Sequence, residues 1–166
     1  MAVANRATRS LEMGMRMIRL AAIIVAGLVL AQGSARADGA TADEVVAFVD
    51  KMVAHIKEVG ETQAFADFSD TKGAWVKGDL YGFCHALDGT SLAHGGNPNL
   101  VGKNLLSFKD PDGVAMNAQL IDLVKKDGKG WVDYKWPNPA TKKVQAKSVY
   151  GEMVDGKFLC GSGYYK

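Results

Sequence analysis

The chain has 166 residues, of which 48% are hydrophobic and 23% charged, and its formal net charge is +2. This length is typical of one domain behind a targeting segment. The five arginines all lie within the first 36 residues, so we expect no basic face of the kind that binds nucleic acid.

The first 37 residues have the pattern of a signal peptide. The basic leader contains Arg6, Arg9, Arg16 and Arg19, and an apolar run follows at residues 20–31. Ala35 and Ala37 have the small-x-small spacing that signal peptidase accepts, which predicts a cut after Ala37. The apolar run is about 12 residues, shorter than the roughly 20 of a spanning helix. We therefore expect a periplasmic or secreted protein without a membrane span after cleavage; a leader retained as an anchor is the alternative.

Residues 38–166 are predicted to form one domain. They contain 15 lysines, no arginine and 17 acidic residues, which gives a net charge of 15 − 17 = −2. Without arginine there is no bidentate clamp for a carboxylate or phosphate. An anion site in this domain would have to use lysine, backbone N–H groups or aromatic hydroxyls.

Three helices are predicted. In residues 41–60 apolar side chains recur at spacings of three and four, with Thr41 as the N-cap and Gly60 as the stop. A short helix is expected at residues 61–68. A third helix is expected at residues 114–126, before Gly128.

The strands are predicted as a hairpin followed, after the third helix, by three further strands. Their ranges are 79–87, 91–95, 131–136, 144–154 and 157–165. Tight turns join the strands within each cluster, which favours antiparallel pairing. We expect an α+β domain with a five-stranded antiparallel sheet. The long N-terminal helix would cover one face, and a helix and loops would cover a pocket on the other.

Two cysteines, Cys84 and Cys160, lie in the predicted domain. In an oxidising compartment they can form one disulfide; two buried free thiols are the alternative. Neither cysteine has a second Cys or a His at ligand spacing, so no metal site is expected.

The aromatic and lysine-rich segment at residues 128–150 supplies the main candidates for ligand binding. Tyr134 and Trp136 share one strand face and can form the wall of a pocket, or ordinary core. Trp131 lies on the opposite face and is expected to be core under a helix. Lys147 shares a strand face with Gln145 and Val149. Lysine is rarely buried beside an apolar residue unless it is paired, so this position favours an ammonium group aimed at a ligand carboxylate over a solvated strand face.

Further candidates are His94 and Tyr150. His94 can give a ligand a hydrogen bond, or it can stabilise the fold through the glycine-rich loop that follows it. Tyr150 is a weaker candidate, as is Tyr81, and His85 is expected to be a satisfied structural group. No nucleophile, base and orienting acid stand at a usable spacing, so we expect neither an enzyme nor a cofactor.

An ordered set of short motifs covers nearly the whole predicted domain. The set comprises Asp88-Gly89-Thr90, Ala93-His94-Gly95, residues 98–104, residues 110–113, Gly130-Trp131, Tyr134, Trp136, Lys147, Tyr150 and residues 161–165. In this order the motifs resemble a single Cache domain of the second type, a PAS-like extracytoplasmic sensor fold.

The resemblance implies a module that binds or senses a small molecule, with small organic acids favoured, and that acts in signal transduction. The chain lacks the transmembrane helices and output domain of the related receptors, so it looks like a stand-alone secreted form. The alternative is a ligand-free interaction subunit that docks on a membrane sensor or transporter.

Overall fold

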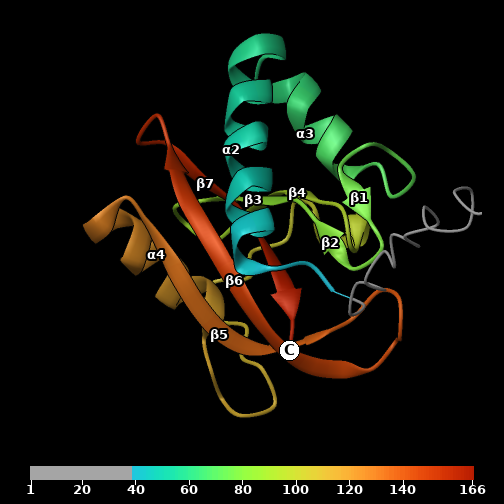
Figure 1. Cartoon of the computed structure of the whole chain (residues 1–166). Coiled ribbons are helices and arrows are strands. Elements are labelled where there is room, and N and C mark those ends of the chain that lie inside the picture. The colour runs from blue at the N-terminus through green and yellow to red at the C-terminus, as the bar shows by residue number, and fades with distance from the viewer. Residues whose placement is uncertain (1–38) are drawn as a thin grey trace, which may run out of the picture. The chain divides into compact units, whose positions relative to one another are not determined.

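Figure 1 shows the computed structural model, which describes residues 39–166. The predicted signal peptide and its cut after Ala37 lie outside the described residues. Within the described part of the chain, no helix is long and apolar enough to cross a membrane.

The two N-terminal helices begin and end close to where the sequence predicts. Helix α2 spans Ala42–Val59 and α3 spans Glu61–Ser69. A capping box starts α2: the Thr41 hydroxyl accepts the N–H of Glu44 at 3.3 Å, and the Glu44 carboxylate accepts the N–H of Thr41 at 2.9 Å. Gly60 ends α2 with a φ of 82°, a backbone conformation that favours glycine.

The main sheet is antiparallel and has five strands in the order β4-β3-β7-β6-β5, which confirms the predicted fold class. Its strands are β3 (Phe83–Ala86), β4 (Ser91–His94), β5 (Lys129–Pro137), β6 (Val144–Val154) and β7 (Phe158–Tyr165). The C-terminal strand β7 thus lies in the centre, between β3 and β6.

The single strand predicted at residues 79–87 is wrong, because Gly82 divides it. The short strands β1 (Val76–Lys77) and β2 (Leu80–Tyr81) form a separate two-stranded sheet before β3 begins. A Cβ at Gly82 would lie 2.6 Å from Met52 Cε of α2. At this glycine the chain therefore passes close beneath the Met52 side chain of the helix. The 3₁₀ helix at Pro98–Leu100 was also not predicted.

The helices cover opposite faces of the sheet. In Figure 1, α2 crosses the sheet over β6 and β7, and α3 follows it along the same side. Helix α4 (Met116–Asp127) packs on the other face, where Leu120, Ile121 and Val124 meet Val132 and Val149. Trp131 lies beside Tyr150 on the α2 face but is 37% exposed, so its predicted core position is wrong: it stands at the edge of the sheet beyond the reach of α2.

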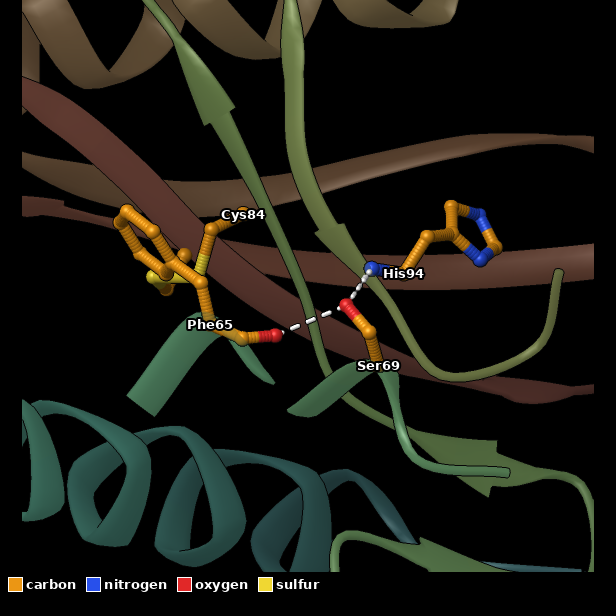
Figure 2. The surroundings of a disulfide bond; sticks show 5 residues. Phe65, Ser69, Cys84 and His94 are labelled. Carbon is orange, nitrogen blue, oxygen red and sulfur yellow. Dashed lines mark hydrogen bonds between the residues drawn. A yellow bond between two sulfur atoms is a disulfide. The ribbon is translucent and has the colours of Figure 1, made fainter. Parts of the chain in front are cut away.

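A disulfide joins Cys84 of β3 to Cys160 of β7 on the α2 face. The two residues are direct cross-strand partners, and both are fully buried. Figure 2 shows that the neighbouring Ser69 hydroxyl donates to the carbonyl of Phe65 at 2.8 Å and accepts the N–H of His94 at 3.2 Å. This pair of bonds ties the end of α3 to β4 and fixes the backbone of His94.

Candidate ligand-binding site

A cavity lies on the α4 face of the sheet. Its sheet side is formed by six aromatic and imidazole side chains: Tyr81, Phe83, His85, His94, Tyr134 and Trp136. Its cover is formed by Leu105, in the loop at residues 95–113, and by Met116, Asn117 and Leu120 of α4. The space left for the centre of a water molecule is about 10 Å³, which is room for roughly one water.

Lys147 of β6 lies against this cavity wall and is 1% exposed. Its Nζ stands 3.9 Å from the ring centroid of Tyr81, which lines the cavity, and 4.7 Å from that of Tyr165. These are cation–π distances. Among the described residues, Nζ has no hydrogen-bond partner and takes part in no ion pair. The amine is therefore buried against two aromatic ring faces.

Gly163 of the neighbouring strand makes room for the Lys147 side chain. A Cβ at Gly163 would lie 3.0 Å from Lys147 Cε and would overlap the backbone oxygen of Ser148. The absence of a side chain at this position therefore leaves space for the lysine stem beside β7.

Burial lowers the pKa of Lys147 to about 7, and the charge of Asp79 opposes this shift. Loss of hydration penalises the charged form of a buried amine. At neutral pH the amine of Lys147 is thus divided between its neutral and ammonium forms, unlike a surface lysine.

His94 presents one ring nitrogen that is free of the backbone. Its Nδ1 accepts the N–H of Asn97 at 3.0 Å, which assigns the proton of the neutral ring to Nε2. Burial, with smaller effects from His85 and Lys147, lowers the pKa of His94 to about 3. The ring is therefore neutral at physiological pH, with Nε2 as a donor. The bond to Asn97 is also the stabilising contact with the glycine-rich loop that the alternative interpretation expected.

His85 lies in the cavity wall rather than in a satisfied structural position. Its Nδ1 has no hydrogen-bond partner among the described residues, and burial lowers its pKa to about 4. The sequence interpretation of His85 as satisfied is wrong, because the ring of this strand residue faces the cavity and not the core under α2.

Three tyrosines, Tyr81, Tyr134 and Tyr165, lie next to Lys147. Tyr134 is the direct cross-strand partner of Lys147 on β5, and Tyr165 is its partner on β7. Tyr165 donates to the carbonyl of Pro137 at 2.9 Å and lies 3.4 Å from the hydroxyl of Tyr81. Burial raises the pKa of all three, that of Tyr165 to about 12. All three are neutral hydrogen-bond donors at physiological pH.

The structure places three of the five predicted binding residues, Tyr134, Trp136 and His94, in the cavity wall. Lys147 does not line the cavity and lies behind Tyr81. Tyr150 instead packs in the core under α2, and its hydroxyl lies 3.3 Å from the Glu152 carboxylate. Its side chain points to the opposite face because it is an odd number of strand residues from Lys147, so the structure does not place Tyr150 in the cavity.

The loop over the cavity is held at its end by Asp110. The buried carboxylate of Asp110 accepts the N–H groups of Lys135 at 2.7 Å, Val114 at 2.8 Å and Asp112 at 2.9 Å. Burial acts to raise its pKa, but these three bonds outweigh burial and lower it. The Asn117 amide donates to the carbonyl of Leu105 at 3.1 Å. These residues of the cover were not found from the sequence, which gives no signal for how α4 is turned toward the sheet.

Comparison with known protein families shows to which family the chain belongs. The Cache domain family model (dCache_2) matches residues 71–155. The chain belongs to the Cache family. The match spans β1 to β6 and contains the cavity wall, so the resemblance seen in the sequence is confirmed.

The relatives of this Cache chain are sensory proteins. Over 88 residues it is 31% identical to the methyl-accepting chemotaxis protein McpP of Pseudomonas putida, which covers 52% of this chain and 16% of McpP. The chain therefore spans less than a fifth of that relative. A methyl-accepting chemotaxis protein of Vibrio parahaemolyticus has a similar structure, with a TM-score of 0.66, 28% identity, and 74% of this chain and 86% of that chain covered.

A second similar structure is a Cache chemosensory domain studied for carboxylic acid recognition. It has a TM-score of 0.58 and 22% identity and covers 99% of both chains. At this identity the likeness concerns the fold. The Cache domain seen here thus has the architecture of chemosensory, ligand-binding domains.

Proposed function

We propose that this Cache domain binds a small carboxylate outside the cytoplasm and acts as a sensing module. The observation that carries the proposal is the buried Lys147 amine, which has neither hydrogen-bond nor ion-pair partner among residues 39–166. An unpaired buried charge costs several kcal/mol. A ligand carboxylate would supply the missing partner.

The neighbouring groups fit a carboxylate with a short apolar tail. The hydroxyls of Tyr134 and Tyr81 and Nε2 of His94 are neutral donors, and Trp136 offers an apolar surface. One buried amine matches one negative charge, so we favour a monocarboxylate. A carboxylate of two to four carbons needs more room than one water, and we expect Trp136 or the loop at residues 95–113 to shift on binding.

The comparisons support this proposal at the level of the family. The chemotaxis proteins that resemble the chain are sensors, and a Cache domain of the same fold recognises carboxylic acids. With the predicted signal peptide, they favour a periplasmic location and a single domain at residues 38–166. A cavity wall of aromatic rings and neutral imidazoles favours binding without catalysis.

A second candidate is an interaction subunit that docks on a membrane sensor or transporter. The loop over the cavity favours it, because this loop exposes Val101, Leu106 and Phe108, the last of them 45% exposed. Phe108 also contacts Trp136 of the cavity wall, with ring centroids 5.5 Å apart. A partner on this loop would therefore touch the cover of the cavity.

A ligand screen with matched lysine variants tests the carboxylate site. Formate, acetate, propionate and butyrate would be titrated by calorimetry into the wild type, Lys147→Met and Lys143→Met, the last being an exposed lysine in the turn between β5 and β6. We expect Lys147→Met to weaken binding by about 30-fold or more, because loss of one partner of a buried charge pair costs about 2–5 kcal/mol.

Lys143→Met should bind as the wild type does. Equal affinity of the wild type and Lys147→Met would refute the role of the amine. No binding of any of the four acids, together with a membrane protein that co-purifies, would favour the interaction subunit.

A further inference from the structure

We propose that a carboxylate enters this site together with one proton, which the Lys147 amine takes up, so that ligand and proton add no net charge to the cavity. This inference rests on the proposed function, because it concerns the same site. It goes further in stating what the site binds. The site takes up one carboxylate anion and one proton, which together have the composition of the uncharged acid.

The groups around the amine carry almost no compensating charge. The ring faces of Tyr81 on β2 and Tyr165 on β7 lie 3.9 Å and 4.7 Å from Nζ, and Tyr134 of β5 is the cross-strand partner of Lys147. His94 of β4 is near enough for the charge of Lys147 to act on it, and it is neutral, as is His85 of β3 in the cavity wall. Asp79, in the turn before β2, is the acid whose charge acts on the amine, but it forms no ion pair with it.

Burial without an acidic partner favours the neutral amine in the empty site. The pKa of Lys147 is lowered to about 7 by burial, and those of His85 and His94 lie well below that, at about 4 and 3. Near neutral pH, Lys147 is therefore the group of this cluster whose protonation responds to a ligand. A carboxylate at the amine favours the ammonium form and raises its pKa.

The expected proton uptake depends on pH in a defined way. An amine with a pKa of about 7 is about nine-tenths neutral at pH 8 and about one-tenth neutral at pH 6. If the bound amine stays protonated up to pH 8, binding takes up about 0.9 proton at pH 8 and about 0.1 at pH 6. Affinity for the anion then falls by about tenfold for each pH unit above 7.

Calorimetry in buffers of different ionisation enthalpy measures this uptake directly. Acetate and propionate would be titrated into the purified protein at pH 6 and pH 8, and the slope of observed enthalpy against buffer ionisation enthalpy gives the number of protons. We expect a slope near one at pH 8 and near zero at pH 6. Binding with a slope near zero at pH 8 overturns the inference and leaves the proposed function standing.

Lys147→Arg identifies the group that takes up the proton, because arginine stays charged at both pH values. We expect this variant to bind without proton uptake; uptake that persists in it would assign the proton to His94 or to the ligand and overturn the assignment to Lys147. If the variant does not fold, the ¹³Cε shift of Lys147 in the labelled wild type at pH 8 gives the same answer. It should move to the ammonium value on addition of acetate, and an unchanged shift contradicts the inference. No binding of either acid at either pH refutes the proposed function itself.

Discussion

The two faces of the five-stranded sheet differ in how completely their side chains are satisfied. On the α2 face, Cys84 and Cys160 form a disulfide within an apolar cluster that includes Val49 and Phe68. On the α4 face, His85 of β3 and Lys147 of β6 lie beside a cavity, each with a buried nitrogen that lacks a hydrogen-bond partner among the described residues. Neighbouring residues of β3 thus have different surroundings: Cys84 belongs to the disulfide, and His85 faces the cavity.

The contrast shows where stability and binding can be separated by mutation. Buried polar groups without partners are costly, and they persist where function requires them. Changes on the α2 face should therefore lower the free energy of unfolding, and changes at the amine should act mainly on binding.

The largest expected effect is loss of the disulfide on the α2 face. In Cys84→Ala/Cys160→Ala the unfolded chain is released from a loop of 76 residues, and the free energy of unfolding should fall by about 4 kcal/mol. Urea denaturation followed by tryptophan fluorescence measures this change. Carboxylate affinity of the folded fraction should change little, and a large loss of affinity at native stability would show that the two faces are not separable.

A smaller effect of opposite sign is expected at Lys147. Lys147→Met replaces the unpaired amine by an apolar side chain and should raise the free energy of unfolding of the empty protein by about 1–3 kcal/mol at pH 6. The folded pKa of about 7 lies below that of the unfolded chain, so the unfolded wild type binds more protons between pH 7 and pH 10.5. The free energy of unfolding of the wild type therefore rises through that range. The difference in free energy of unfolding between Lys147→Met and the wild type should become smaller.

Denaturation of both proteins at pH 6 and pH 9 checks this expectation. If Lys147→Met is less stable than the wild type at both pH values, the amine contributes to the stability of the fold. That result would contradict the proposed difference between the two faces of the sheet.

The smallest effect concerns Asp110, which anchors the loop over the cavity. Asp110→Asn retains one acceptor oxygen but loses the charge that three N–H groups stabilise, so Tm at pH 7 should fall by a few degrees. Because the pKa of Asp110 is lowered in the folded state, its contribution is present above the unfolded pKa of about 4 and is lost as pH falls through the folded pKa. Thermal melts from pH 7 to pH 2 should show the two proteins converging, whereas a constant difference would contradict this role.

Much of the fold could be predicted because its signals are local. Thr41 and Gly60 mark the ends of α2, and β6 at Val144–Val154 has the predicted bounds. The strands β1 and β2 have two residues each, too few for any periodicity to show. The break at Gly82 lies where the chain passes close to Met52 of a helix distant in the sequence, a neighbour that no local pattern reveals.

Strand alternation could predict which residues share a face of the sheet, but not which of them bind a ligand. Tyr134, Trp136 and Lys147 share a face because they lie on paired strands of known period. Tyr150 was assigned to the binding site although alternation places it on the other face. Asn117 and His85 were missed since their exposure to the cavity depends on how α4 and the loop pack over the sheet, and this is decided by long-range contacts.

The narrowness of the cavity has a kinetic consequence. With about 10 Å³ left for the centre of a water molecule, a carboxylate that binds at the amine as proposed would require the wall to part first. The observed rate of association should then level off at high ligand concentration, at the frequency with which the empty protein opens, and this plateau should be the same for acetate and butyrate. Discrimination between such acids would consequently reside in how long each remains bound.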